Sequence, residues 1–424
     1  MMFDLLKQKL DALDCAAWEL TETRGRRWEF YFIRHRLDQN RVAEVTTDTV
    51  RVYRSLEDGK YLGSASGEIS PTATEAEIDK ALGDLLFQAG LVKNPAYTLT
   101  DVAVTVPPRT EPVDIEAIAE QFLKTVRAVP ETETEDINSY ELFVNEVTRR
   151  TLNSNGVAYE CTYPSSMLEV VVNARREGHE IELYRNFTSG ACGAEKLQND
   201  IADAMRFGRD RLSAEPTPKL EDIDVVFSTQ DAVALYEYFA DRCSAAFKYR
   251  RLSDWEPGQS VGAGDTLEIE ALPELENSSR NFPVDEEGSV IAPRFLIRGG
   301  KAENFWGGRQ FSQYLGLENS SIVHNFRAGG GTEDASALRS GDYLELVEFS
   351  DFQVDSIGGD VAGEIRLGYL HRGGETKIVT GGSVSGNMRD SAPTMRFSRE
   401  SAQYDTWVIP AVTRLKKLRI TGIA

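Results

Sequence analysis

The sequence predicts an α+β protein: an N-terminal α/β domain with an antiparallel sheet and helices, and a C-terminal β-rich, barrel-like domain. First, a chain of 424 residues is longer than one hydrophobic core ordinarily supports, which suggests two domains. Second, helix and strand patterns are mixed in the first half, whereas short strands separated by glycines fill most of the second. Third, the polar, proline-rich segment SAEPTP at 213–218 lies between the halves. We therefore expect domains at residues 1–215 and 219–424.

The N-terminal half predicts helices around an antiparallel sheet. Aromatic and charged residues alternate over 23–70, with turn signals at Asp38-Gln39-Asn40 and Asp58-Gly59, which indicates a meander of strands. A second strand pattern, over 137–185, is divided by the tight-turn sequence Asn153-Ser154-Asn155-Gly156. The acidic run 131–136 is interpreted as a solvated linker. Helical patterns cover Phe3–Leu13, Ala73–Gln88 before Gly90, Val113–Ala128 before Pro130, and Glu195–Leu212.

The centre of the chain predicts a short apolar strand, 224–227, followed by a buried helix from Thr229 to about Phe247. Thr229 is the expected N-cap. Apolar residues then recur every three or four positions, so one broad face of the helix should be buried. After this helix the pattern is mostly strand and loop, and the many glycines there indicate tight turns and bulges.

Composition narrows the class of partner. The net charge, 47 minus 68 or −21, disfavours nucleic acid and anionic membrane surfaces. No apolar run is long enough to span a bilayer, and the acidic, amphipathic start does not resemble a secretory signal, so we expect a cytoplasmic protein. Four scattered cysteines without a CxxC pair indicate reduced, structural thiols: Cys15, Cys161, Cys192 and Cys243.

Several short stretches, taken in order, resemble the TldD/PmbA family of zinc-peptidase-related proteins, also called modulators of DNA gyrase, over nearly the whole chain. The resemblance implies an N-terminal α/β domain, a C-terminal β-rich domain, and dimers that enclose a cavity where peptides are cut. The stretches are Asn153 to Gly156, Asp224 to Phe247, Val284 to Ser289, Phe295 to Gly300, and a late block from Phe352 to Asn387.

The active, TldD-like branch of that family carries His-Glu-x-x-x-His on the helix and a cysteine near the C-terminus. On this chain the motif falls on Tyr236, Glu237 and Asp241, and the cysteine region, 395–401, reads MRFSRES. Only the glutamate remains, and a phenol with one carboxylate makes a poor zinc site. The sequence therefore resembles the PmbA/TldE-like branch, which lacks the zinc motif. We expect no catalytic, cofactor or metal residue in this chain, and zinc only in a TldD-like partner.

No other metal site is expected, because His35, His179, His324 and His371 are far apart in sequence. Glu237 has a plain structural alternative, an ion pair with Arg242 or Arg250. Tyr236 and Asp241 lie five residues apart, about 500° around a helix, so they should not share a face.

Three functions stay open. The first, which we favour, is a non-catalytic subunit of a TldD/TldE-type zinc metalloprotease complex that helps to bind and process unfolded peptides (proteolysis). The second is an autonomous homodimeric module that binds peptide or protein. The third is an enzyme of altered chemistry that uses Tyr236, Glu237 and Asp241. We also expect a dimer through the C-terminal half, because its many strand edges must be covered.

Overall fold

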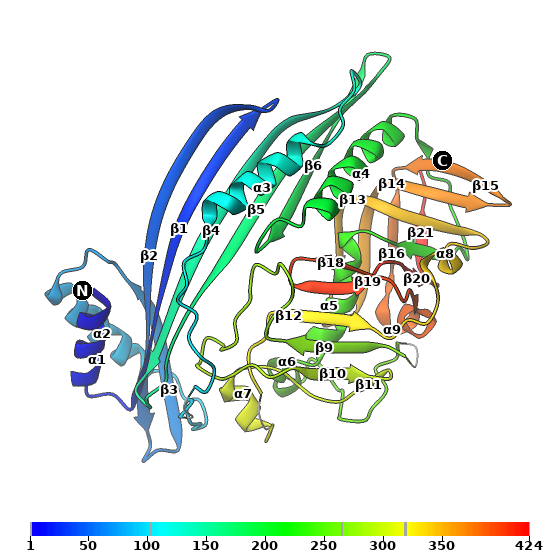
Figure 1. Cartoon of the computed structure of the whole chain (residues 1–424). Coiled ribbons are helices and arrows are strands. Elements are labelled where there is room, and N and C mark those ends of the chain that lie inside the picture. The colour runs from blue at the N-terminus through cyan, green and yellow to red at the C-terminus, as the bar shows by residue number, and fades with distance from the viewer. Residues whose placement is uncertain (1, 102–103, 264–265, 318–319, 424) are drawn as a thin grey trace.

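The computed structural model describes residues 2–101, 104–263, 266–317 and 320–423. Its N-terminal half contains a six-stranded antiparallel sheet in the order β3-β2-β1-β4-β5-β6. Figure 1 shows these long strands arching over one side of the molecule. The predicted meander is therefore confirmed. The strands are β1 (Ala17–Ile33), β2 (Arg36–Leu56), β3 (Tyr61–Ile69), β4 (Glu135–Asn153), β5 (Ala158–Arg176) and β6 (His179–Ser189).

The turns of this sheet confirm two sequence signals and correct a third. Gly59 and Gly156 adopt positive φ in the turns that follow β2 and β4, as their sequences predict. The turn predicted at Asp38-Gln39-Asn40 is wrong, because these residues lie inside β2. The chain reverses instead at Arg34 and His35, both with positive φ (44° and 58°). Histidine is one of the residues found more often at positive φ, but arginine is not, so the turn depends on the strand pairing on either side.

Four helices cover the sheet, close to where the sequence predicts them. α1 and α2 pack on the end of the sheet near the N-terminus, and α3 and α4 pack on the other end, facing the C-terminal half (Figure 1). A capping box between Thr74 and Glu77 begins α2, and Asp114 caps α3. The helices are α1 (Met2–Ala12), α2 (Glu75–Ala89), α3 (Ile115–Arg127) and α4 (Ala194–Leu212).

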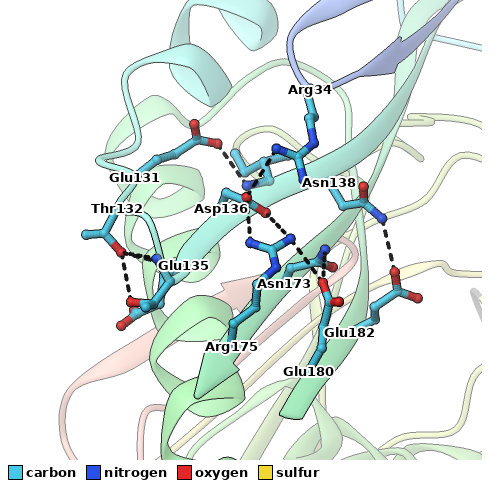
Figure 2. Close-up of polar contacts among 12 residues, drawn as sticks. Arg34, Glu131, Thr132, Glu135, Asp136, Asn138, Asn173, Arg175, Glu180 and Glu182 are labelled. Carbon is cyan, nitrogen blue, oxygen red and sulfur yellow. Dashed lines mark hydrogen bonds and ion pairs between the residues drawn. The ribbon is translucent and has the colours of Figure 1, made fainter. Parts of the chain in front are cut away.

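The acidic run 131–136 is an exposed connection, as predicted, only over 131–134, whereas Glu135 and Asp136 belong to β4 and are partly buried. Figure 2 shows it turning into β4 among the arginines of neighbouring elements. Glu131 accepts a hydrogen bond from the backbone of Ile137, and Asp136 is bound by Arg175 at 2.8 Å. Glu135 pairs with Arg209 of α4 at 3.1 Å. The run therefore fastens β4 to β5 and to α4, a role visible only once the strands are paired.

The C-terminal half is β-rich, as predicted, and consists of two sheets. One has the order β11-β10-β9-β12-β19-β18; the other has the order β17-β20-β8-β13-β14-β15-β7, with β16 paired to β14 and β21 paired to β16. Apolar residues of both sheets share one core with α5. The first sheet comprises β9 (Glu268–Leu272), β10 (Arg294–Arg298), β11 (Lys301–Ala302), β12 (Asn325–Gly329), β18 (Ser401–Tyr404) and β19 (Trp407–Pro410).

The second sheet begins with a strand from the proline-rich segment, since β7 pairs with β15. Its strands are β7 (Glu215–Pro216), β8 (Val225–Phe227), β13 (Tyr343–Val354), β14 (Asp360–Arg372), β15 (Glu375–Thr380), β16 (Ser383–Asn387), β17 (Arg396–Phe397), β20 (Thr413–Leu415) and β21 (Arg419–Thr421). The helices of this half are α5 (Val233–Arg242), α6 (Ala245–Tyr249), α7 (Arg309–Tyr314), α8 (Ala335–Leu338) and α9 (Met388–Ser391), with 3₁₀ turns η1 (Gln230–Ala232) and η2 (Ala392–Thr394).

The central helix is shorter than predicted. Thr229 precedes η1 and makes no side-chain cap, so the N-cap prediction is wrong. α5 ends at Arg242, and Ser244 then caps the separate helix α6 by accepting a hydrogen bond from Phe247 N at 3.2 Å. The backbone of Ala245 donates to the carbonyl of Trp306, which fixes the break. The apolar periodicity of the sequence continues across this break because α5 and α6 both bury apolar residues. For this reason the sequence pattern predicted a single helix. Within the described ranges, no helix is long and apolar enough to cross a membrane.

One carboxyl of the N-terminal sheet is buried without a partner. Asp48, on β2, is 0% exposed, and neither of its side-chain oxygens accepts a hydrogen bond. Burial, and then the nearby charge of Glu22, raise the pKa of Asp48 to about 6. Because the folded pKa lies above the unfolded one, this group costs stability as the pH rises from about 4 to 6, and the cost persists at higher pH.

We expect Asp48→Asn to increase the unfolding free energy by about 1–3 kcal/mol at pH 8 and to change it little at pH 4. Urea unfolding at the two pH values measures this difference. Asp38→Asn, on an exposed residue of the same strand, is the matched control and should give no pH-dependent gain. An equal effect of Asp48→Asn at both pH values would contradict the assignment of Asp48 as an unpaired buried acid.

Candidate functional site

Tyr236 occupies the position of the first motif histidine and belongs to the core. Its side chain is 0% exposed, and its phenol lies 2.7 Å from the hydroxyl of Thr413 on β20. Burial raises the pKa of Tyr236 well above its ordinary value, with the Thr413 hydrogen bond acting in the opposite direction. A phenol held neutral and directed into apolar surroundings cannot serve as an anionic ligand.

Glu237 and Asp241 lie on other parts of the α5 surface. Glu237 is exposed and forms no ion pair with any described residue. Asp241 accepts a hydrogen bond from Ser356 at 2.7 Å. Desolvation raises the pKa of both carboxyls, and the charge of Asp241 adds to the effect on Glu237. The structure thus places Tyr236 and Asp241 against different neighbours, and they do not converge as an acid/base set.

The ion pair suggested for Glu237 is wrong. Arg242 instead binds Asp254 at 3.0 Å and donates to the backbone carbonyls of Leu252, Ser356 and Ile357. Arg250 lies over the ring of Phe311, 5.3 Å from its centroid. Arg242 therefore fastens α5 to the turn after β13, and Glu237 projects from the helix without a charged neighbour to pair with.

The segment expected to hold the family's cysteine does come close to this helix. Arg396 and Phe397 form β17, and Phe397 is the register partner of Thr413, the residue that meets Tyr236. Ser398 is buried, with its hydroxyl bonded to the carbonyl of Glu400 and to the amide of Val412. Sequence order alone did not establish this proximity, which depends on β20 lying between β17 and β8.

The four histidines and four cysteines are dispersed. His324 lies 2.8 Å from Glu286, His35 lies 3.0 Å from Glu131 in the turn after β1, and His371 stacks on Tyr343. Burial raises the pKa of each cysteine thiol, so these thiols are poor nucleophiles. The described residues contain no group of three or more His, Cys, Asp or Glu side chains placed to hold a metal ion.

A hollow between the two halves was not predicted from the sequence. It is a cavity of about 470 Å³ between β6 and α4 on one side and β18 with the start of η1 on the other. A second hollow of about 230 Å³ adjoins it and shares Phe187, Asp200, Gln230 and Tyr404 with it. The residues of the larger hollow are spread along the sequence from Phe122 to Asp405 and form no linear motif, so the sequence contains no signal that identifies them.

Comparison with known proteins connects this arrangement to a family. Residues 221–422 match the family model described as the PmbA/TldA metallopeptidase C-terminal domain. This part of the chain, slightly less than half of it, therefore matches a domain of the TldD/PmbA family. A search of curated proteins gives no match. Because the matched residues include α5 and β17 to β20, the motif positions described above can be compared with those of the family directly.

Solved structures share the fold over the whole chain at low identity. TldE from Thermococcus kodakarensis is 14% identical, with a TM-score of 0.76, covering 99% of this chain and 100% of that one. A proposed modulator of a DNA gyrase from Thermotoga maritima is 16% identical, with a TM-score of 0.77 and 99% coverage of both chains. One from Bacteroides thetaiotaomicron is 15% identical, with a TM-score of 0.79, covering 100% of this chain and 98% of that one.

The zinc implied by the TldD branch does not fit the residues at the motif positions. Zinc requires imidazole, thiolate or carboxylate donors that converge on one point. Here the first position is a buried phenol bonded to Thr413, the last is a carboxyl bonded to Ser356, and residues 395–401 contain no thiol. We therefore derive no metal-dependent step for this chain.

Proposed function

We propose that this protein is a non-catalytic, TldE/PmbA-like subunit of a TldD/TldE-type zinc metalloprotease complex, and that it helps to bind unfolded peptides for cleavage. The observation that carries the proposal is the placement of Tyr236 in the core, hydrogen-bonded to Thr413, where an active subunit needs a zinc-binding histidine. The fold likeness to a TldE protein agrees with this branch. Zinc and the catalytic base would come from a TldD-like partner.

Open strand edges supply a means of holding a peptide. Among the strands that the structure describes, β6 is the last of the N-terminal sheet and pairs only with β5, and β18 is the last of its sheet and pairs only with β19. An extended peptide can add to such an edge through main-chain hydrogen bonds that do not depend on its sequence. This suits a subunit that handles unfolded chains, whereas the separation of Tyr236 from Asp241 argues against altered acid/base chemistry.

The purified protein alone is expected to hold less than about 0.1 zinc per chain and to cleave no unfolded peptide. With a TldD-like companion that has an intact His-Glu-x-x-x-His helix, we expect a mixed dimer that cleaves the peptide. Elemental analysis, light scattering and a peptide-cleavage assay measure these quantities. A companion whose motif glutamate is changed to glutamine should assemble but not cleave.

Two results would contradict the proposal. One is about one zinc per chain, together with cleavage by this protein alone. The other is failure of the protein to associate with any zinc-bearing companion at micromolar concentration while it forms a homodimer, which would favour an autonomous binding module. Dimerisation through the C-terminal half and a cytoplasmic location stay predictions.

A further inference from the structure

The hollow between the two halves joins two sheet edges to a set of charged and aromatic side chains. Figure 1 shows the end of β6 and the start of α4 close to β18, and β6 and β18 are in contact. The wall formed by these elements includes Phe187 on β6 and Tyr404 on β18. A peptide laid along the edge of β6 would thus direct alternate side chains toward this hollow.

Acidic groups outnumber basic groups around the hollow. Its only basic residues within the described part of the chain are Arg185 and Lys196, and both already have partners: Arg185 binds Glu348, and Lys196 binds Asp200. The carboxylates that line the two joined hollows are Asp200, Asp203, Asp231, Glu276, Glu348 and Asp405. With six carboxylates against two bases, the hollow as a whole attracts cations.

Three of these carboxylates, Asp231, Glu276 and Asp405, form no ion pair with a basic residue among the described residues. Asp231 accepts a hydrogen bond from the hydroxyl of Thr229 at 3.3 Å, and Glu276 makes no side-chain ion pair. Burial, and then the charge of Glu348, raise the pKa of Asp231 to about 6. A positive charge placed beside Asp231 would offset both effects, because an opposite charge favours the ionised carboxyl.

The aromatic walls favour a particular kind of cation. Lys196 already lies over the ring of Tyr404, with its ammonium 4.6 Å from the centroid, so one cation–π contact exists there. Phe187, which is only partly buried, lines the same cavity and offers apolar surface to an alkyl chain. A lysine or arginine side chain has both parts, an apolar stem and a charged head. A bare metal ion would leave the aromatic surface unused.

We propose that the two joined hollows bind a lysine or arginine side chain of an extended peptide, with the charged head at Asp231 and the stem against Phe187 and Tyr404, which line the same hollow. Glu276, in the adjoining larger hollow, adds to the negative charge that attracts the side chain. The inference rests on the proposed peptide-binding function and adds a substrate preference to it. It places the selecting residues away from the degenerate motif, since Tyr236, Glu237 and Asp241 do not line the hollow.

The test measures binding of labelled, unstructured decapeptides by fluorescence anisotropy, with the full-length protein alone and with its zinc-bearing companion. The peptides are composed of Gly, Ser and Thr and differ only at the central residue: arginine, its neutral analogue citrulline, or glutamate. We expect the arginine peptide to bind at least about tenfold more tightly than the citrulline peptide, and the glutamate peptide to bind most weakly. This preference should shrink at high salt.

Asp231→Asn combined with Glu276→Gln should reduce the arginine preference to less than about threefold. The matched control, Asp38→Asn with Glu68→Gln, removes two exposed carboxylates from β2 and β3 and should keep the preference. Both double variants preserve side-chain shape, and circular dichroism checks their folding.

The possible failures can be told apart. Equal binding of the arginine and citrulline peptides, or a preference unchanged in the Asp231/Glu276 variant, overturns the present inference and leaves the proposed function intact. If none of the peptides binds to the protein, with or without the companion, both the inference and the peptide-binding part of the proposed function are wrong.

Discussion

The double variant Tyr236→His, Asp241→His is expected to lose about 3–5 kcal/mol of unfolding free energy and to show no detectable peptide cleavage. Tyr236 is fully buried, so a histidine leaves unfilled space, deprives Thr413 of its partner and brings in a ring that itself needs a hydrogen bond. Removing Asp241 deprives Ser356 of its acceptor. Urea unfolding and zinc titration with a cleavage assay measure the two results.

Tyr236→Phe is the matched control for stability. It keeps the ring and loses only the hydrogen bond to Thr413, so it should cost about 1 kcal/mol. The expected absence of zinc-dependent cleavage has a separate physical reason. Positions 236 and 241 contact different neighbours, and residues 395–401 contain no thiol to complete a set of zinc ligands. Strong zinc-dependent cleavage by the double variant without a companion would show that the scaffold interpretation is wrong.

Arg414→Met is expected to cost about 3–5 kcal/mol of unfolding free energy, because it breaks a buried ion pair on one side only. Arg414 is 8% exposed, and its guanidinium binds Asp224 at 2.7 Å and the carbonyls of Leu338, Ser340 and Asp342. Without it, the largely buried carboxylate of Asp224 and three backbone oxygens lose their donor. Urea unfolding measures the loss.

The chain contains a close control for this variant. Arg396 on β17 is the register partner of Arg414 on β20, but its side chain is 45% exposed and it pairs with Glu333 at the surface. Arg396→Met should therefore cost less than about 1 kcal/mol. Similar losses in the two variants would mean that burial does not decide the contribution of these arginines.

The sequence by itself determined the elements whose signals are local. The helices of the N-terminal half were predicted to within about two residues, because their caps and apolar periodicity lie within the helices themselves. The turn at 153–156 followed from its Asn-Gly ending in the same way. The loss of both motif histidines was also evident from the sequence, since it depends on residue identity at Tyr236 and Asp241.

Tertiary structure decided everything that depends on segments distant in sequence. The reversal of the chain at Arg34 and His35 follows from the pairing between β1 and β2. The break in the central helix follows from a backbone hydrogen bond that Ala245 donates to Trp306. Tyr236 is a core residue because Thr413, on β20, meets its phenol. The hollow beside Asp231 exists because β6, α4, β13 and β18, which are distant in sequence, surround it. Such contacts depend on how the sheets pair and pack against each other. The type and spacing of neighbouring residues do not determine that pairing and packing.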